Sequence, residues 1–119
     1  MCYQLSLSRR YDDVPGDTSP LMPNHPILGV LTLEFHLPDA ASLKDKRSIL
    51  KSMLARLHNT FNVSAAEIDE NDRWQTAVIG IAVVTNSTRH AQQSIDNVLA
   101  WIERSYPEAI IMKQTIEII

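Results

Sequence analysis

The residues best suited to chemistry in this chain are cations and hydroxyls at the starts of two expected helices. Helix starts expose unpaired backbone N–H groups and the positive end of the helix dipole, and both attract anions. Lysine and arginine side chains nearby would add charge to such a site. We therefore predict a site for phosphate or an RNA backbone, built from Ser42, Lys44, Lys46, Arg47, Lys51, Ser87, Arg89 and His90.

Two interpretations of these residues stay open. In the first, Lys44 and Arg47 supply charge to a bound phosphate, while Ser42 and Ser87 anchor the geometry. In the second, the hydroxyls only cap helices and the charges only keep the surface solvated. A cation in the first helical turn, such as Lys44, opposes the helix dipole at a cost of roughly a few tenths of a kcal/mol, which favours a role beyond solubility.

The distribution of charge singles out the first of the two helices. Residues 42–61 contain five Lys and Arg against one Asp, a net charge of +4, while the rest of the chain has a net charge of −7. The whole chain therefore carries −3, which argues against nucleic-acid binding through bulk charge. Any such binding would use a stripe along one flank of the apolar helix face, formed by Lys44, Arg47, Lys51 and His58.

Other chemistries lack the residue spacing that they require. The four histidines show no metal-ligand spacing, and the acidic cluster at 67–72 lacks the pattern of a calcium loop, so we expect no metal and no cofactor. No Ser/His/Asp or Cys/His arrangement stands out, so we expect no catalytic residue. Glu34 and His36 share a strand face and could do acid–base work, yet two residues without a recognisable pocket are weak support for an enzyme.

Length and composition bound the class of protein. A chain of 119 residues suits one compact domain. The single cysteine, Cys2, excludes an internal disulfide framework, which fits a reducing compartment. No apolar run approaches the ~20 residues of a membrane span, and the N-terminus lacks the apolar core of a signal peptide. We therefore expect a cytoplasmic protein.

Hydrophobic periodicity divides the chain into an arm and one domain. Residues 1–26 hold four of the six prolines, which is typical of an extended or disordered arm. Alternating or apolar segments predict strands at 27–37, 62–69, 74–85 and 110–119. Helical spacing predicts one helix at 42–61, capped by Ser42, and a second that begins at the cap candidates 86–88 and is ended by Pro107. The domain is expected to cover residues 27–119.

The element order β-α-β-β-α-β predicts an α+β fold, the ferredoxin-like sandwich. Its four-stranded antiparallel sheet would have the strand order 4-1-3-2 and carry both helices on one face. We also expect the two central strands, the first and the third, to be parallel to each other. Both helices would then start at the same edge of the sheet, which brings the two groups of candidate residues to one rim.

The strand at 74–85 is apolar on both faces, so the open face of the sheet would leave an apolar strip uncovered. The strip consists either of Val78, Gly80, Ala82 and Val84 or of Ala77, Ile79, Ile81 and Val83. Such strips usually mark protein interfaces, and a homodimer that stacks sheet on sheet would cover this one. Trp101 either extends that contact or packs against the neighbouring helix. The open face offers no set of stacking aromatics, which disfavours base stacking there.

Three stretches carry a family pattern: GVLTLEFHLPDAASLKDKRSILKSMLARL, FNVSAAEIDENDRWQTAVIGIAVVTN and the RHA that opens the second helix. Together they resemble the YlxP-like family of small uncharacterised bacterial proteins, over about residues 27–119. The resemblance implies the ferredoxin-like fold and no established activity. Family members are often encoded beside translation initiation and ribosome-binding factors. The arm departs from the short N-terminus expected of the family, so either it is an addition or the true start lies downstream, at Met22.

Together these patterns predict a non-catalytic homodimeric module that binds RNA or a ribosomal assembly. The first alternative is a structural module for protein interaction, including interaction with its own second copy. The second alternative is an enzyme that acts on a phosphorylated metabolite, which would need a deeper pocket than the sequence locates.

Overall fold

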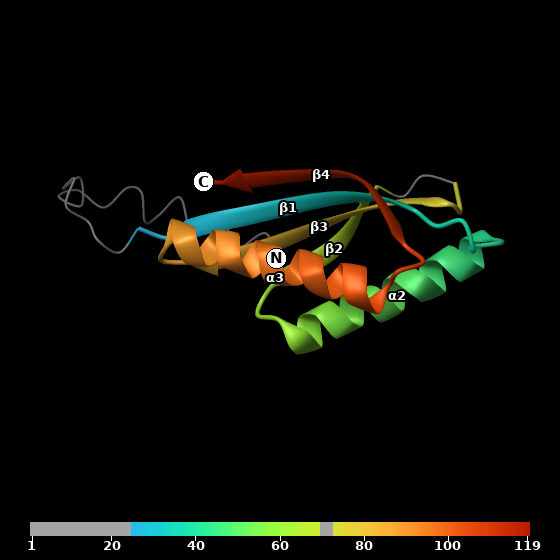
Figure 1. The fold of residues 1–119 in the computed structure, drawn as a ribbon, viewed down its shortest axis with the longest axis horizontal. Helices are drawn as coiled ribbons and strands as arrows, with labels where there is room; N and C mark the ends of the chain where they lie inside the picture. The colour runs from blue at the N-terminus through green and yellow to red at the C-terminus, as the bar shows by residue number, and fades with distance from the viewer. Residues whose placement is uncertain (1–24, 70–72) are drawn as a thin grey trace, which may run out of the picture.

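The computed structural model describes residues 25–69 and 73–119, so the predicted arm lies outside the described residues except for its last two. The elements in chain order are β1 (Ile27–His36), α2 (Leu43–Thr60), β2 (Ser64–Asp69), β3 (Thr76–Thr85), α3 (Thr88–Ser105) and β4 (Ile110–Ile118). The strands form one sheet in the order β2-β3-β1-β4, with every neighbouring pair antiparallel. Both helices lie on one face of this sheet (Figure 1). The predicted α+β ferredoxin-like fold is confirmed.

The central strands β1 and β3 form the sheet side of the core because their sequences alternate with the period of a strand. The side chains that face the helices and are buried come from Leu31, Leu33, Phe35, Ala77, Ile79, Ile81 and Val83. Of the two sets that could have formed the uncovered strip of β3, the structure therefore buries one. The other set, Val78, Gly80, Ala82 and Val84, lies on the open face.

The two helices cover the other side of the core with their apolar stripes. Helix α2 buries Leu50, Met53 and Leu57 together with one charged residue, Lys46, and α3 buries Ala91, Ile95, Val98, Trp101 and Ile102. The Trp101 ring meets Phe61 edge-on at 5.9 Å between centroids, and the guanidinium of Arg56 lies 5.1 Å from its centre. Trp101 thus packs against the neighbouring helix, one of its two expected roles.

The relative direction of the central strands differs from the prediction. Strands β1 and β3 are antiparallel, with Leu31 opposite Ile81. The expectation of parallel central strands was wrong because each helical crossover keeps its two flanking strands parallel, whereas the β2–β3 hairpin between the crossovers reverses the chain. Helix α2 therefore begins at one end of the sheet and α3 begins at the opposite end, as Figure 1 shows. The two groups of candidate residues do not share one rim.

Candidate functional site

Helix α2 holds five of the nine Lys and Arg residues in the described ranges. Four of them are exposed: Lys44, Arg47 and Lys51 on one side of the helix, and Arg56, whose guanidinium lies beside the Trp101 ring. At about 100° per residue, Lys44, Arg47 and Lys51 fall within a sector of about 60°, whose centre is about 120° from the midpoint of Leu50 and Met53 on the buried face. We call these three cations the α2 basic stripe. The stripe is exposed to solvent along one flank of the buried face of α2.

The start of α2 already holds an anion of its own. Ser42 Oγ accepts a hydrogen bond from the Asp45 backbone N–H at 3.1 Å, which confirms Ser42 as the N-cap. Asp45 Oδ2 in turn accepts from the Ala41 N–H at 2.9 Å. These reciprocal bonds resemble a capping box and place a carboxylate at the positive end of the helix dipole. At this helix the exposed charges of the stripe are therefore better placed for an external anion than the N-terminus is.

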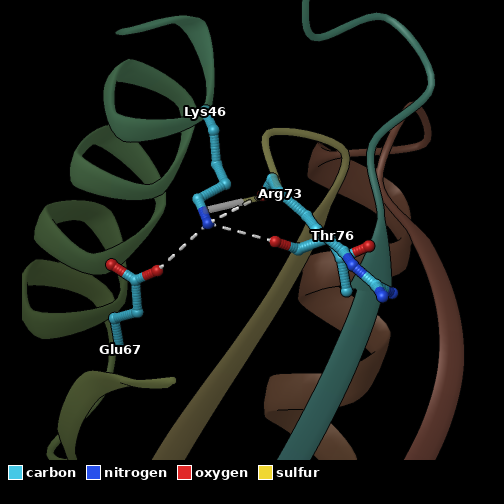
Figure 2. A network of polar contacts seen from close by, with 4 residues as sticks. All are labelled: Lys46, Glu67, Arg73 and Thr76. Carbon is cyan, nitrogen blue, oxygen red and sulfur yellow. Dashed lines mark hydrogen bonds and ion pairs between the residues drawn. The ribbon is translucent and has the colours of Figure 1, made fainter. Parts of the chain in front are cut away.

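Lys46 is buried, with 3% of its surface exposed. Its Nζ donates hydrogen bonds to the backbone carbonyls of Arg73 at 3.1 Å and Thr76 at 3.2 Å, and lies 3.7 Å from Glu67 Oε2. Figure 2 shows Lys46 reaching from α2 to these groups on the β2–β3 hairpin. The prediction that Lys46 offers its charge to an external phosphate is wrong, because the ammonium holds the helix to the hairpin.

The sequence contained a signal for the burial of Lys46. On a helical projection its position falls between those of Met53 and Leu57, in the middle of the apolar stripe. A lysine there must either bend back to solvent or find buried acceptors. The sequence could not identify the acceptors of the Lys46 ammonium, because two of them are backbone carbonyls, which every residue type has.

The second group of candidate residues surrounds the start of α3. Ser87 is the N-cap, with its Oγ accepting from the His90 N–H at 3.4 Å, and no acidic residue lies in the first turn. Arg89 and His90 are exposed. His90 also lines a pocket of about 310 Å³, whose polar wall includes Thr85 and Asn97. This second basic surface is separate from the α2 basic stripe, because the two helices begin at opposite ends of the sheet.

Two further predicted positions have roles that the sequence did not show. His58, expected in the basic stripe, accepts a hydrogen bond at Nε2 from the Ala65 N–H at 3.1 Å. His36 Nδ1 donates to the Gln75 carbonyl at 3.2 Å, beside a hollow of about 240 Å³ that Trp74 also lines. Glu34 is not among the residues that line this hollow.

Two features are absent from the part of the chain that the structure describes. Within 25–69 and 73–119, no group of three or more His, Cys, Asp or Glu side chains could hold a metal ion. In the same part of the chain, no helix has the length and apolar character needed to cross a membrane.

Comparison with known proteins connects this geometry to a family. A family model described as "Protein of unknown function (DUF503)" matches residues 28–115. The chain belongs to this family. It is 43% identical over 82 residues to the uncharacterized protein YlxP of Bacillus subtilis (strain 168), and the match covers 69% of this chain and 88% of that protein. The predicted family resemblance is confirmed, and family membership brings no known activity with it.

Among solved structures, a de novo designed protein with a ferredoxin fold, determined by solution NMR, is similar to this chain. The TM-score is 0.50 and the sequence identity 17%, with 76% of this chain and 84% of the designed chain covered. At this identity the similarity concerns the fold alone. It agrees with the strand order and the one-sided helix layer described above.

Proposed function

We propose that this protein is a cytoplasmic, non-catalytic module that binds RNA through its phosphate backbone on the α2 basic stripe. The observation that carries the proposal is the exposure of Lys44, Arg47 and Lys51 on one side of α2, in a chain whose net charge is −3. The one acidic residue of the helix, Asp45, is bonded to the Ala41 amide. The charge of Lys46 is directed inward at Glu67.

The length of the stripe fits a short segment of nucleic acid. Lys44 and Lys51 are seven residues apart, which is about 10 Å along the helix axis. Each strand of a B-DNA duplex advances about 3.4 Å along the helix axis per phosphate, and the phosphates of an extended single strand lie farther apart, so the stripe spans at most about three phosphates. The solvent side of α2 presents no Phe, Tyr or Trp for base stacking. We therefore expect binding with strong salt dependence and little sequence preference.

A matched pair of variants tests the proposal. The first replaces Lys44, Arg47 and Lys51 with Ala, and the control replaces three exposed cations elsewhere, Arg89, Arg104 and Lys113. Both lower the net charge by the same amount, and exposed charges contribute little to stability. In anisotropy titrations of a labelled single-stranded RNA at low salt, the stripe variant should bind about tenfold or more weakly, and the control within about threefold of wild type. Equal losses in both variants, or no loss in the stripe variant, would overturn the proposal.

A second candidate function, a structural module for self-association, is favoured by the open face of the sheet. On that side Val84 is 68% exposed and Ile68 is 61% exposed, next to Val78 and Ala82. Stacking of this face on a second copy would cover these side chains. The variant Ala82→Lys should then show a lower molar mass than wild type in light scattering. An unchanged mass would contradict stacking of this face.

Ionic strength separates the two candidates. Binding of phosphates by Lys44, Arg47 and Lys51 releases counterions and weakens steeply as salt is added, whereas apolar docking on the open face does not. The two surfaces also involve different residues. A variant of the α2 basic stripe should therefore leave self-association unchanged, and a variant of the open face should leave RNA binding unchanged.

A further inference from the structure

Strand β4 is an edge strand whose apolar side chains are poorly covered. It lies at one end of the strand order and contains nine residues. Met112 is 63% exposed and Ile110 is 45% exposed, while Ile111, Ile116 and Ile118 are only partly covered. The cause is the position of α3, which packs mainly over β1 and β3 and touches β4 little. Long apolar edges of this kind invite pairing with another strand.

The outward backbone groups of β4 follow from its register with β1. Leu28 and Ile119 exchange two hydrogen bonds, at 3.1 and 2.8 Å. Hydrogen-bonded and non-hydrogen-bonded pairs alternate in an antiparallel ladder, so residues 113, 115 and 117 also direct their N–H and C=O groups toward β1. Residues 114, 116 and 118 therefore direct theirs away from the sheet, where the described chain provides no further strand.

The other edge of the sheet is less suited to pairing. Strand β2 has six residues and its register with β3 shifts between Glu67 and Asp69. The corresponding shift in β4 lies near Met112, which leaves residues 113–118 as an uninterrupted stretch. That stretch contains no proline, and its two charged residues, Lys113 and Glu117, have opposite signs.

We propose that β4 pairs antiparallel with β4 of a second copy, about a two-fold axis at Thr115, so that the two sheets join into one. In this register Lys113 lies opposite the partner's Glu117, and Glu117 lies opposite the partner's Lys113. Residues with outward backbone groups also meet, since Gln114 lies opposite the partner's Ile116. The interface is isologous, as closed dimers usually are.

Charge selects this register over its neighbours. An axis at Ile116 places Lys113 opposite the partner's Ile119, and an axis at Gln114 places it opposite the partner's Thr115. The axis at Thr115 matches both charged pairs, and the pairs fall at non-hydrogen-bonded positions, where cross-strand side chains approach most closely. Ile116 and Ile118, half-covered in one copy, gain neighbours from the partner strand.

This dimer is compatible with the functions proposed above and does not depend on them. A two-fold axis perpendicular to the sheet keeps the helices of both copies on one side and leaves the open face uncovered. Helix α2 packs on β2, at the edge of the sheet away from β4. The α2 basic stripes of both copies therefore remain accessible.

Cross-linking tests the register directly, in a Cys2→Ser background that removes the single native thiol. Thr115→Cys should form a covalent dimer under mild oxidation, because residue 115 lies opposite itself. Lys113→Cys and Glu117→Cys should each stay monomeric alone and should cross-link when mixed. A monomeric Thr115→Cys, or preferential cross-linking of Thr115→Cys with Glu117→Cys, would overturn the proposal.

Charge reversal provides a second test that leaves the monomer intact. Glu117 lies opposite Val30 on β1, so Glu117→Lys removes no cross-strand ion pair within one chain. In the dimer it sets lysine against lysine at two symmetric points, which should raise the dissociation constant about tenfold. Lys113 lies opposite Glu34 on β1, so the rescue variant must also reverse Glu34. The triple variant Glu34→Lys/Lys113→Glu/Glu117→Lys should restore association in analytical ultracentrifugation. A wild type that sediments as a monomer at high micromolar concentration, or a Glu117→Lys variant that associates as tightly as wild type, would contradict edge pairing.

Discussion

Replacing Lys46 with Met tests whether the buried ammonium holds α2 to the β2–β3 hairpin. Methionine keeps the length and apolar contacts of the lysine stem while removing its charge and donors. The hydrogen bonds from Nζ to the carbonyls of Arg73 and Thr76 are lost, and so is the ion pair with Glu67. The variant therefore isolates the polar network from the packing around it.

The expected loss follows from these contacts. Each part-buried carbonyl left without its donor costs about 1 kcal/mol. The ion pair adds less than about 1 kcal/mol, because Glu67 is 26% exposed and partly screened by water. The total is about 2–3 kcal/mol, which corresponds to a fall in Tm of roughly 10–20 °C for a domain of this size.

Urea denaturation and thermal melting measure this loss, with Lys44→Met as the matched control. Lys44 lies two residues earlier on the same helix and is exposed, so its replacement should change stability by less than about 0.5 kcal/mol. Glu67→Gln should cost less than Lys46→Met, because Nζ keeps its carbonyl partners. A Lys46→Met variant as stable as the Lys44→Met control would refute the structural role assigned to the ammonium.

Three further predictions concern the fold. Ile79→Lys should fail to fold because Ile79 is fully buried. Ala82→Lys, on the open face, should keep the wild-type circular dichroism spectrum. If both variants fold, the assignment of these residues to the two faces of the sheet is wrong. Gly29→Ala should destabilise by about 1–3 kcal/mol, because the added methyl meets Val83, Ile95 and Ala91 at 3.1–3.3 Å in the core. Gly80→Ala should lower the free energy of unfolding by less than Gly29→Ala, since its methyl meets the end of the exposed Ile68 side chain. A larger loss for Gly80→Ala than for Gly29→Ala in urea denaturation would contradict this packing. Removing residues 1–25 should leave Tm within about 2 °C, and a larger fall would show that the arm contributes to the domain.

The strands and helices were predictable because local patterns determine them. The alternation of Leu31, Leu33 and Phe35 matches the buried face of β1, and Ser42 caps α2 as its position suggested. The periodicity of residues 74–85 left two sets of side chains that could face the helices. Packing of the helices on one side of the sheet decided between them, which is information that the strand itself does not contain.

The arrangement of the candidate site was less predictable. The expectation of parallel central strands placed the two groups of basic residues at one edge of the sheet. Strands β1 and β3 are antiparallel, so the two groups lie at opposite ends. The carbonyl partners of Lys46 are 27 and 30 residues away in the chain and have no signature in residue type. Strand β4 has the alternation of a half-buried strand, yet α3 leaves its isoleucines only partly covered. In each case the surroundings of the residues depend on how one helix or strand lies relative to another, which the local sequence pattern does not determine.

The most direct test of the proposed function is the salt dependence of RNA binding by the wild-type protein. Contact of three cations with the phosphates of a single strand predicts that log K falls with log salt with a slope of about 2. The variant that lacks Lys44, Arg47 and Lys51 should show a slope near zero at any residual binding. A wild-type protein that binds no RNA at low salt, or whose affinity does not change with salt, would contradict the α2 basic stripe as an RNA-binding surface.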